Sequence, residues 1–488
     1  MFEVTVPALR RDRLAAALGD AQYRALDELA ERARADLSGH TLWNLSSTAT
    51  GGGVAEMLHG LVGYALAAGI DTRWLVVEGD APFFALTKRI HNLLHGSPGD
   101  GGPLGAAERA TYEGLLAREA AGLRASLEPG DVVVLHDPQT AGLTDVVRAC
   151  GATPIWRCHV GTDTTDGRTE QAWSFLRPYL GSAAATVFSR AAYVPAWLGD
   201  GGGRTAIIQP AIDPVSTKNL ELDPGRVLGV LTAAGLLDGR PAAAAGVAHP
   251  ATLVRDGGPF PRDVPLVVQV SRWDHLKDMA GVLDAFCRGV VDGAPGSEAH
   301  LLLAGPSVAG VTDDPEGLRV LEEVTAAWRA LPDRARRRVG LASLDMTDVD
   351  ENALVVNALQ RHATVVTQKS LREGFGLTVA EAMWKSRPVV ASAVGGIRDQ
   401  IDDGVSGRLV GPDDRRAFAA AVVDLVADPG SARRLGAAAH ERVRERFLPD
   451  RQLGQWLDLV RQVRSGAGPA DRGRVLTDRA VPVSEVGR

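Results

Sequence analysis

Two glutamates, Glu373 and Glu381, stand eight positions apart in the stretch QKSLREGFGLTVAEAMWK. Between them, Gly374 and Gly376 leave backbone amides bare next to the expected start of a helix. Amides at a helix N-terminus attract anions such as phosphate. A loop carboxylate beside that anion site can bind sugar hydroxyls, and a second carboxylate inside the helix can hold a ribose diol. The spacing therefore suits one extended ligand, a nucleotide-sugar.

A structural interpretation of the same residues stays open. Thr378 and Glu381 fit the capping box, in which a hydroxyl residue and a glutamate three positions later bond to amides at a helix start. Glu373 could equally be a solvated loop charge. Glu381 could also serve as cap and ligand together.

Two cations, Arg272 and Lys277, follow an expected strand in the segment VSRWDHLKD. They can make charge-assisted hydrogen bonds to a diphosphate and neutralise the charge that develops on it as a leaving group. The alternative is a solvated helix start. Only five of the 53 basic residues are lysines, and three of these five lie in the motifs described here. Because a compact ammonium and a planar guanidinium bind differently, the retained lysines favour a ligand.

A glycine turn follows the first expected strand in the sequence GGGVAE, at Gly51, Gly52 and Gly53. It is not a Walker loop, because no GK[ST] follows, and it does not match G-x-G-x-x-G. Such a turn is more often structural than functional. Its place at the first strand-to-helix turn favours close approach of a ligand.

Several polar side chains of the N-terminal half also follow expected strands or share a helix face. A single histidine is more often a packed or capping residue than a catalyst, and a polar helix face is usually solvated. With those alternatives open, the candidates for binding an acceptor sugar are Glu78, Lys88, Asn92, His136 and Asp137, and His159 is a further candidate at a strand end.

The elements that must position these residues form two α/β series. Short apolar strands, typical of buried parallel sheets, are expected within residues 41–47, 72–79, 131–138, 153–160, 185–190 and 205–213, and again within 265–274, 300–306, 338–344, 363–370 and 387–396. Helical patterns separate them. We therefore expect an α/β fold with two Rossmann-like, doubly wound domains facing a central cleft, and ligands beyond the carboxyl ends of the strands.

The expected domains are residues 1–212 on the acceptor side and residues 213–445 on the donor side. Residues 446–488 should form a C-terminal helix and a disordered tail. Residues 239–256, rich in Ala, Gly and Pro, read as a surface insertion in the second domain.

Composition excludes several classes of protein. The net charge is −7 and no basic block occurs, so nucleic acid is not an expected partner. No apolar run is long enough to span a membrane, and the N-terminus lacks the order of a signal peptide, so a cytoplasmic protein is expected. The three cysteines form no metal-type pair or disulfide pattern. The oligomeric state stays open, a homodimer included.

At this point the motifs resemble a known family. REGFGLTVAEAMW is similar to the E-x7-E motif of retaining glycosyltransferases of family 4, which have the GT-B fold, and SRWDHLKD is similar to their donor-phosphate motif. The runs STATGGGVAE and FFALTKRIHN narrow the resemblance to trehalose glycosyltransferring synthases and the related trehalose phosphorylases. Matching segments follow in order over most of residues 40–410.

The resemblance implies a retaining transfer of glucose from ADP- or UDP-glucose to glucose. We expect no obligate metal, since Arg272, Lys277 and the helix dipole can neutralise the diphosphate. Arg272 and Lys277 would bind the diphosphate, Glu373 the donor sugar, and Glu381 the ribose. His159 would stabilise an oxocarbenium-like transition state through its backbone or ring. No carboxylate nucleophile is evident, so the leaving phosphate would help deprotonate the acceptor, unlike the two-carboxylate hydrolases. The donor would also meet the glycine turn at residues 51–53 and the amides of Gly374, Phe375, Gly376, Leu377 and Thr378.

Two segments depart from the family pattern, HVGTDTTD after His159 and the insertion at 239–256. Both leave the acceptor less defined than the donor. The alternatives are a phosphorylase with inorganic phosphate in the diphosphate site, a family 4 enzyme with another sugar acceptor, and a non-enzymatic nucleotide-sugar-binding module. Glu381 favours the synthase, because a phosphorylase substrate has no ribose for this glutamate to bind.

Overall fold

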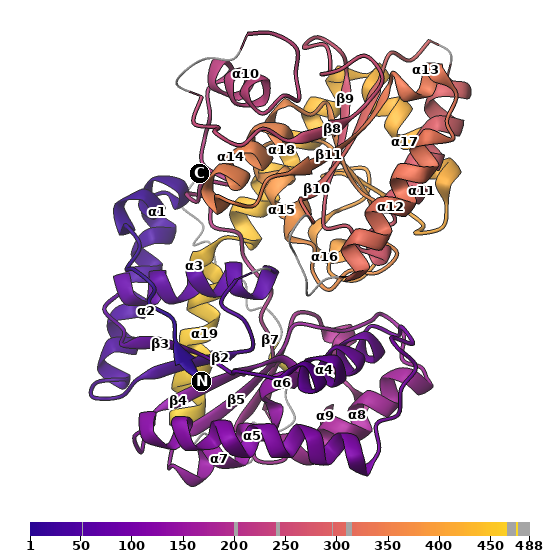
Figure 1. The fold of residues 1–488 in the computed structure, drawn as a ribbon. Coiled ribbons are helices and arrows are strands. Elements are labelled where there is room, and N and C mark those ends of the chain that lie inside the picture. Colours follow the sequence, from indigo (N-terminus) through magenta and orange to yellow (C-terminus); the bar gives the residue numbers. More distant parts are fainter. Residues whose placement is uncertain are drawn as a thin grey trace. The chain divides into compact units, whose positions relative to one another are not determined.

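The chain forms two compact units in the computed structural model, which describes residues 1–50, 52–199, 204–240, 245–294, 296–308, 315–465 and 475–476. Unit 1 comprises Met1–Ala211 and Pro449–Arg488, and unit 2 comprises Ile212–Leu448 (Figure 1). The chain returns to unit 1 through α19 (Pro449–Arg464), which packs against α2 (Asp20–Asp36) and α3 (Gly53–Ala67). The expected disordered tail lies almost entirely outside the described residues.

The sheet of unit 1 has eight strands in the order β1-β3-β2-β4-β5-β6-β7-β15. Its neighbouring strands run parallel except β1 and β3. The chain winds from β2 outward to β3, and in the opposite direction from β4 to β7, so its winding reverses between β2 and β4. The strands are β1 (Phe2–Glu3), β2 (Leu42–Ser46), β3 (Thr72–Val76), β4 (Val132–His136), β5 (Thr153–Cys158), β6 (Ala185–Phe188), β7 (Arg204–Ile207) and β15 (Val475–Leu476).

Helices cover this sheet because its central strands are buried and mostly apolar. Every residue of β2, β4 and β6 is buried, and Trp74, Trp156 and Phe188 are among the largest fully buried side chains. Strands that are buried in this way need a packed layer on both faces. Besides α2, α3 and α19, the helices of unit 1 are α1 (Arg11–Leu18), α4 (Ala81–Leu94), α5 (Ala106–Ser126), α6 (Asp137–Thr140), α7 (Thr144–Ala149), α8 (Gly167–Leu180) and α9 (Ala196–Gly199).

The sheet of unit 2 has seven strands in the order β14-β13-β12-β9-β10-β11-β8. Here the winding reverses between β9 and β12, because β10 and β11 follow on one side and β13 and β14 on the other. Only β8 is antiparallel to its neighbour. The strands are β8 (Thr252–Val254), β9 (Leu266–Val270), β10 (His300–Pro306), β11 (Val339–Leu344), β12 (Val365–Gln368), β13 (Val389–Ser392) and β14 (Arg408–Val410).

Helices separate the strands β9 to β13 of unit 2, as expected from the helical patterns between them. A π-helix (Cys287–Asp292) directly extends α11. The predicted α/β class, with one doubly wound sheet in each unit, is confirmed. The helices are α10 (Pro224–Ala233), α11 (Met279–Phe286), α12 (Pro315–Arg329), α13 (Asp333–Arg336), α14 (Val349–His362), α15 (Leu377–Trp384), α16 (Ile397–Gln400), α17 (Arg415–Ala427) and α18 (Pro429–Arg446).

The segment 239–256 is more than a surface insertion, and that prediction was incomplete. Its last part forms β8, which pairs with β11 at the edge of the sheet. His249 also bonds to Glu351 of α14, through its backbone N–H at 2.7 Å and its ring at 3.1 Å. A three-residue strand gives too short a pattern to recognise. Residues 241–244 lie outside the described part of the chain.

Candidate active site

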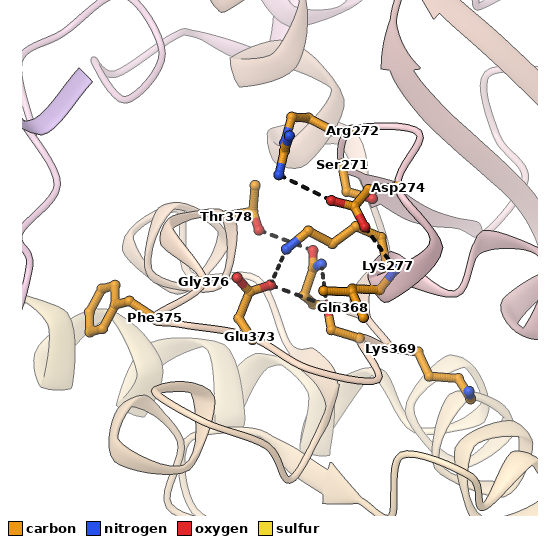
Figure 2. Close-up of polar contacts among 12 residues, drawn as sticks. Ser271, Arg272, Asp274, Lys277, Gln368, Lys369, Glu373, Phe375, Gly376 and Thr378 are labelled. Carbon is orange, nitrogen blue, oxygen red and sulfur yellow. Dashed lines mark hydrogen bonds and ion pairs between the residues drawn. The ribbon is translucent and has the colours of Figure 1, made fainter. Parts of the chain in front are cut away.

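The predicted donor residues of unit 2 gather where the winding of its sheet reverses. Arg272 and Lys277 follow β9, and Glu373 follows β12, the neighbouring strand (Figure 2). At such a reversal the connections leave the sheet toward opposite faces, which opens a crevice at the carboxyl ends of the two strands. The topology therefore explains why residues about 100 positions apart meet.

An ion pair joins the two loops at this position. Lys277 Nζ lies 2.5 Å from Glu373 Oε2, and both side chains are largely withdrawn from solvent. Ser370 Oγ donates a hydrogen bond to the same carboxylate oxygen at 3.2 Å. One cation and one carboxylate are thus held together beyond the carboxyl ends of β9 and β12. A ligand with both phosphate and hydroxyl groups would complement this pair.

Arg272 lies on the same loop but is more exposed. Its Nη2 is 3.1 Å from Asp274 Oδ2. Asp274 in turn caps the short helical turn His275–Lys277, because its Oδ1 accepts the backbone N–H of Leu276 at 2.8 Å. The contact with Asp274 orients the guanidinium locally (Figure 2), and the side chain of Arg272 is 58% exposed.

Buried polar groups that the sequence analysis missed fix the geometry of the two loops. Gln269, fully buried in β9, donates to the carbonyl oxygen of Lys277 at 2.9 Å and accepts the N–H of Lys369 at 3.1 Å. Below them, the buried ammonium of Lys369 pairs with Asp278 and donates to Pro412 O at 2.8 Å. A glutamine inside the apolar run LVVQV and a rare lysine were the available signals.

The start of α15 needs its glycines. Gly376 precedes the helix with φ +88°, a left-handed conformation that favours glycine. A Cβ added to Gly396 would come within 2.6 Å of Phe375 Cα. The loop before α15 and the loop before α16 therefore pack without room for a side chain at Gly396. The first amides of α15, from Leu377 and Thr378, lie directly after this glycine, as expected for an anion-binding helix start.

The capping-box interpretation of Thr378 and Glu381 is wrong. The N-cap of α15 is Gly376, and Thr378 lies inside the first turn, where its hydroxyl donates to Gln368 Oε1 at 3.0 Å. Glu381 is buried in the helix, and its Oε1 lies 3.6 Å from Lys218 Nζ. The hydroxyl therefore serves the neighbouring strand, and the carboxylate is paired with a cation instead of capping the helix.

In unit 1 the candidate residues also gather where the winding reverses, across β2, β4 and β5. His136 Nδ1 lies 3.0 Å from His159 Nε2, and His136 Nε2 lies 3.2 Å from Asn44 Oδ1. The two imidazoles are stacked, with ring centroids 5.3 Å apart. Asn44 was not among the predicted residues. A polar side chain inside the strand LWNLS was its signal.

The buried side chain of Arg157 determines which ring nitrogens of His136 and His159 carry a proton. Arg157 Nε, which can only donate, lies 3.5 Å from His159 Nδ1, and its Nη2 donates to Ser189 at 3.0 Å. His159 therefore carries its proton on Nε2 and donates to His136, which donates from its own Nε2 to Asn44. Burial, helped by the charge of Arg157, lowers the pKa of His136 to about 3 and that of His159 well below its usual value. Both rings are neutral and share one tautomer.

Asp137 begins α6 in a left-handed conformation with φ +63°. Its Oδ1 accepts the backbone N–H of His159 at 2.7 Å. Burial raises the pKa of Asp137 to about 6, although this hydrogen bond and the charge of Arg157 oppose the shift. A strained, half-buried carboxylate with a raised pKa at a strand end is typical of a functional residue.

The other candidates of unit 1 lie apart from this cluster. Glu78 is exposed and pairs with the amino group of Met1. Lys88 is exposed and Asn92 half-buried on α4. Within the described part of the chain no hydrogen bond joins these three residues to the histidine pair. The end of α4 does reach the loop after β5, because His95 Nδ1 lies 3.0 Å from Gly161 O.

The glycine turn of unit 1 is only partly described. Gly52, with φ +130°, is the N-cap of α3, and Gly53 is its first residue, while Gly51 lies outside the described residues. A Cβ added at Gly52 would meet nothing within 4 Å, so open space surrounds this position. Among the residues that the structure describes, no group of three or more His, Cys, Asp or Glu is arranged to hold a metal ion, and no helix is long and apolar enough to cross a membrane.

Comparison with known proteins identifies the family. Residues 44–195 match the family model described as "Trehalose synthase, N-terminal domain", and residues 264–428 match "Glycosyl transferases group 1". The trehalose synthase of Rubrobacter xylanophilus is 38% identical over 439 residues, which cover 90% of this chain and 93% of that protein. The chain belongs to the trehalose synthase family. The trehalose synthase of Pyrococcus horikoshii is 33% identical over 91% of this chain and 94% of its own length.

A more distant relative and a solved structure are also similar to most of the chain. The trehalose phosphorylase of Pleurotus pulmonarius is 26% identical over 96% of this chain and 62% of its own length. An alpha,alpha-trehalose-phosphate synthase structure from Burkholderia xenovorans, 15% identical, superposes with a TM-score of 0.65 over 87% of this chain and all of that one. The GT-B class is thereby confirmed, and the trehalose synthase family member described here is a glycosyltransferase. That its two domains face a central cleft stays a prediction, as do the roles of the site residues.

Proposed function

We propose that this enzyme transfers glucose from a nucleoside diphosphate glucose to free glucose and forms trehalose with retention of configuration. The observation that carries the proposal is the Lys277–Glu373 pair beside the start of α15. It offers a cation and helix amides for phosphate and a carboxylate for sugar hydroxyls within one short stretch of surface. The similarity to trehalose synthases along nearly the whole chain supports the same reaction.

The donor residues would act in the order of the ligand's groups. Glu373 would accept hydrogen bonds from the glucose hydroxyls, Arg272 and Lys277 would stabilise the leaving diphosphate, and Glu381 would bind the ribose. The amides of residues 374–378 would complete the phosphate site. The base, adenine or uracil, is left open by this arrangement, and no metal is required because two cations and a helix start already face the charge.

The acceptor glucose would bind on the side of unit 1. Asp137 is the best-supported residue there, since a carboxylate at a strand end is an acceptor for sugar hydroxyls. Both ring nitrogens of His159 already have protein partners, which favours a role for its backbone over a proton transfer by its ring. The leaving phosphate would then deprotonate the acceptor hydroxyl. A cytoplasmic location and a homodimer remain predictions.

One incubation series tests the proposal. The protein is mixed with glucose and ADP-, UDP- or GDP-glucose, and a non-reducing disaccharide is sought by chromatography. We expect trehalose from ADP- or UDP-glucose. Parallel mixtures of trehalose with phosphate test for a phosphorylase, and glucose 1-phosphate formed there without nucleotide would overturn the proposal.

A matched pair of variants tests the site. Glu373→Gln removes the charge that pairs with Lys277, and should lower kcat/KM on the order of 100-fold, as loss of an interaction at the reacting sugar does. Glu323→Gln makes the same change at an exposed ion pair on α12 and should leave turnover unchanged. Near-normal turnover of Glu373→Gln would refute the donor-site assignment.

A further inference from the structure

Four of the five lysines of the chain lie in unit 2, although arginine is the basic residue almost everywhere else. Each of them contacts a residue of the proposed donor site or its support. Lys277 and Lys369 pair with Glu373 and Asp278 at the phosphate end. The two others, Lys218 and Lys385, both contact Glu381. Lys218 and Lys385 have no role in the assignments above.

Lys385 is buried, with 3% of its surface exposed, and bonds to three neutral oxygens. Its Nζ lies 2.8 Å from Asn219 Oδ1, 2.8 Å from Gln360 Oε1 and 3.1 Å from Glu381 O. Three acceptors match the three N–H donors of an ammonium. A planar guanidinium cannot direct donors to three such positions around one atom. This geometry explains why lysine is kept here.

The three oxygens belong to different parts of unit 2. Glu381 lies on α15 and Gln360 on α14, while Asn219 lies in the segment 213–221 before α10. Lys385 therefore fastens that segment to the helix that carries Glu381. This buried ammonium is therefore one of the contacts that position the segment.

A second buried side chain holds the same segment. Asn357 of α14, fully buried, donates to the backbone carbonyl oxygens of Thr217 and Leu220 at 3.0 and 2.9 Å. Lys218 lies between these two anchored residues. Its side chain is 23% exposed and reaches the carboxylate of Glu381, which is 2% exposed. A segment outside α15 thus places a partly exposed lysine side chain beside the carboxylate of Glu381.

We infer that Lys218 is a binding residue for the nucleoside of the donor, and that Lys385 is a positioning residue for Lys218. The inference rests on the proposed function, in which Glu381 binds the ribose. The carboxylate accepts hydrogen bonds from the ribose diol, and the ammonium beside it donates to an acceptor oxygen or nitrogen of the same nucleoside. Lys385 acts through Asn219, which holds the segment 213–221 in place.

The test separates the nucleoside from the phosphates. Binding of ADP, UDP and inorganic pyrophosphate to the full-length protein is measured by titration calorimetry. The variants are Lys218→Met, which removes the partly exposed ammonium, and Lys385→Arg, which keeps the charge and changes its geometry. Arg319→Lys, at an exposed ion pair on α12, is the matched control and should bind as the wild type does. Circular dichroism and Tm check that each variant is folded.

We expect both variants to raise the Kd of the preferred nucleotide at least about tenfold, the loss of one good hydrogen-bonding contact, while the Kd of pyrophosphate changes less than about twofold. Equal losses for nucleotide and pyrophosphate, or an unchanged nucleotide Kd in Lys218→Met, would overturn the inference. If Lys385→Arg does not fold, Lys218→Met decides alone, since its side chain is partly exposed. A wild type that binds pyrophosphate but neither nucleotide would refute the proposed function itself.

Discussion

The ionised carboxylate of Asp137 should lower the free energy of unfolding, by an amount that depends on pH. Its carboxylate is held in a half-buried site where the ionised form is disfavoured, and its pKa is raised to about 6. Asp137→Asn removes the ionisation but keeps an oxygen for the N–H of His159. Asparagine also tolerates the left-handed φ of +63°. The variant should therefore be more stable than the wild type at neutral pH.

The sign and size follow from linkage. A carboxyl whose pKa is higher in the folded state than in the unfolded state holds its proton more tightly when folded, so stability falls as pH rises from the unfolded to the folded value. For a pKa that rises from 3.8 in the unfolded state to about 6 in the folded state, the full loss of unfolding free energy is up to about 3 kcal/mol. The advantage of Asp137→Asn should thus be about 1 kcal/mol at pH 4.5 and about 3 kcal/mol at pH 8, as upper limits because the residue is half-buried.

Equilibrium unfolding in urea, followed by tryptophan fluorescence at both pH values, measures this difference. Asp137→Ala is the control, because it loses the hydrogen bond to His159 and the tolerance for positive φ, and it should be destabilised at both pH values. Asp137→Asn should also lose turnover at least about tenfold, the usual trade between stability and activity at a site. An asparagine variant that is no more stable than the wild type at pH 8, or equally favoured at both pH values, would refute the reasoning.

Three further predictions concern unit 2. Lys277→Met should weaken ADP and pyrophosphate binding alike, by at least about tenfold in calorimetry, because it removes a cation and leaves Glu373 without it; a loss for ADP alone would contradict this role. Gly376→Ala should destabilise the protein by about 1–2 kcal/mol in urea unfolding, because alanine is strained at φ +88°; an unchanged midpoint would show that the loop adapts. Lys369→Met should cost about 3–5 kcal/mol in the same assay, since it leaves Asp278 charged and unpaired, and adding Asp278→Asn should restore part of the loss.

Much of the fold was predictable because the strands of both sheets are short, apolar and followed by polar residues. That pattern predicts parallel strands covered on both faces, and it also places Arg272, Lys277 and Glu373 at strand ends. The order of the strands does not follow from the pattern. The pairing of β9 with β12 depends on which helices pack on which face, a sum of many small contacts that no local signal reports.

The capping box failed for a different reason. Thr378 and Glu381 have the right spacing, but Gly376 adopts a left-handed conformation and ends the preceding loop, so the helix begins two residues too early for Thr378 to cap it. A motif defined by side chains does not show that the backbone conformation of a glycine sets the start of the helix. The same glycine had already been noted for its bare amide, and both properties come from its missing Cβ.

Buried polar networks were the largest omission, and the physical reason is general. Asn44, Arg157 and Gln269 each interrupt an apolar strand, and an unpaired polar group there would cost more than a hydrogen bond returns. The interruption therefore shows that a partner exists but not which one, because the partner comes from another strand or loop. The lysines carry more information, since four of the five lysines, in a chain with 48 arginines, make contacts in or beside the proposed donor site. Composition, read against position, is thus a signal for the buried networks that motifs miss.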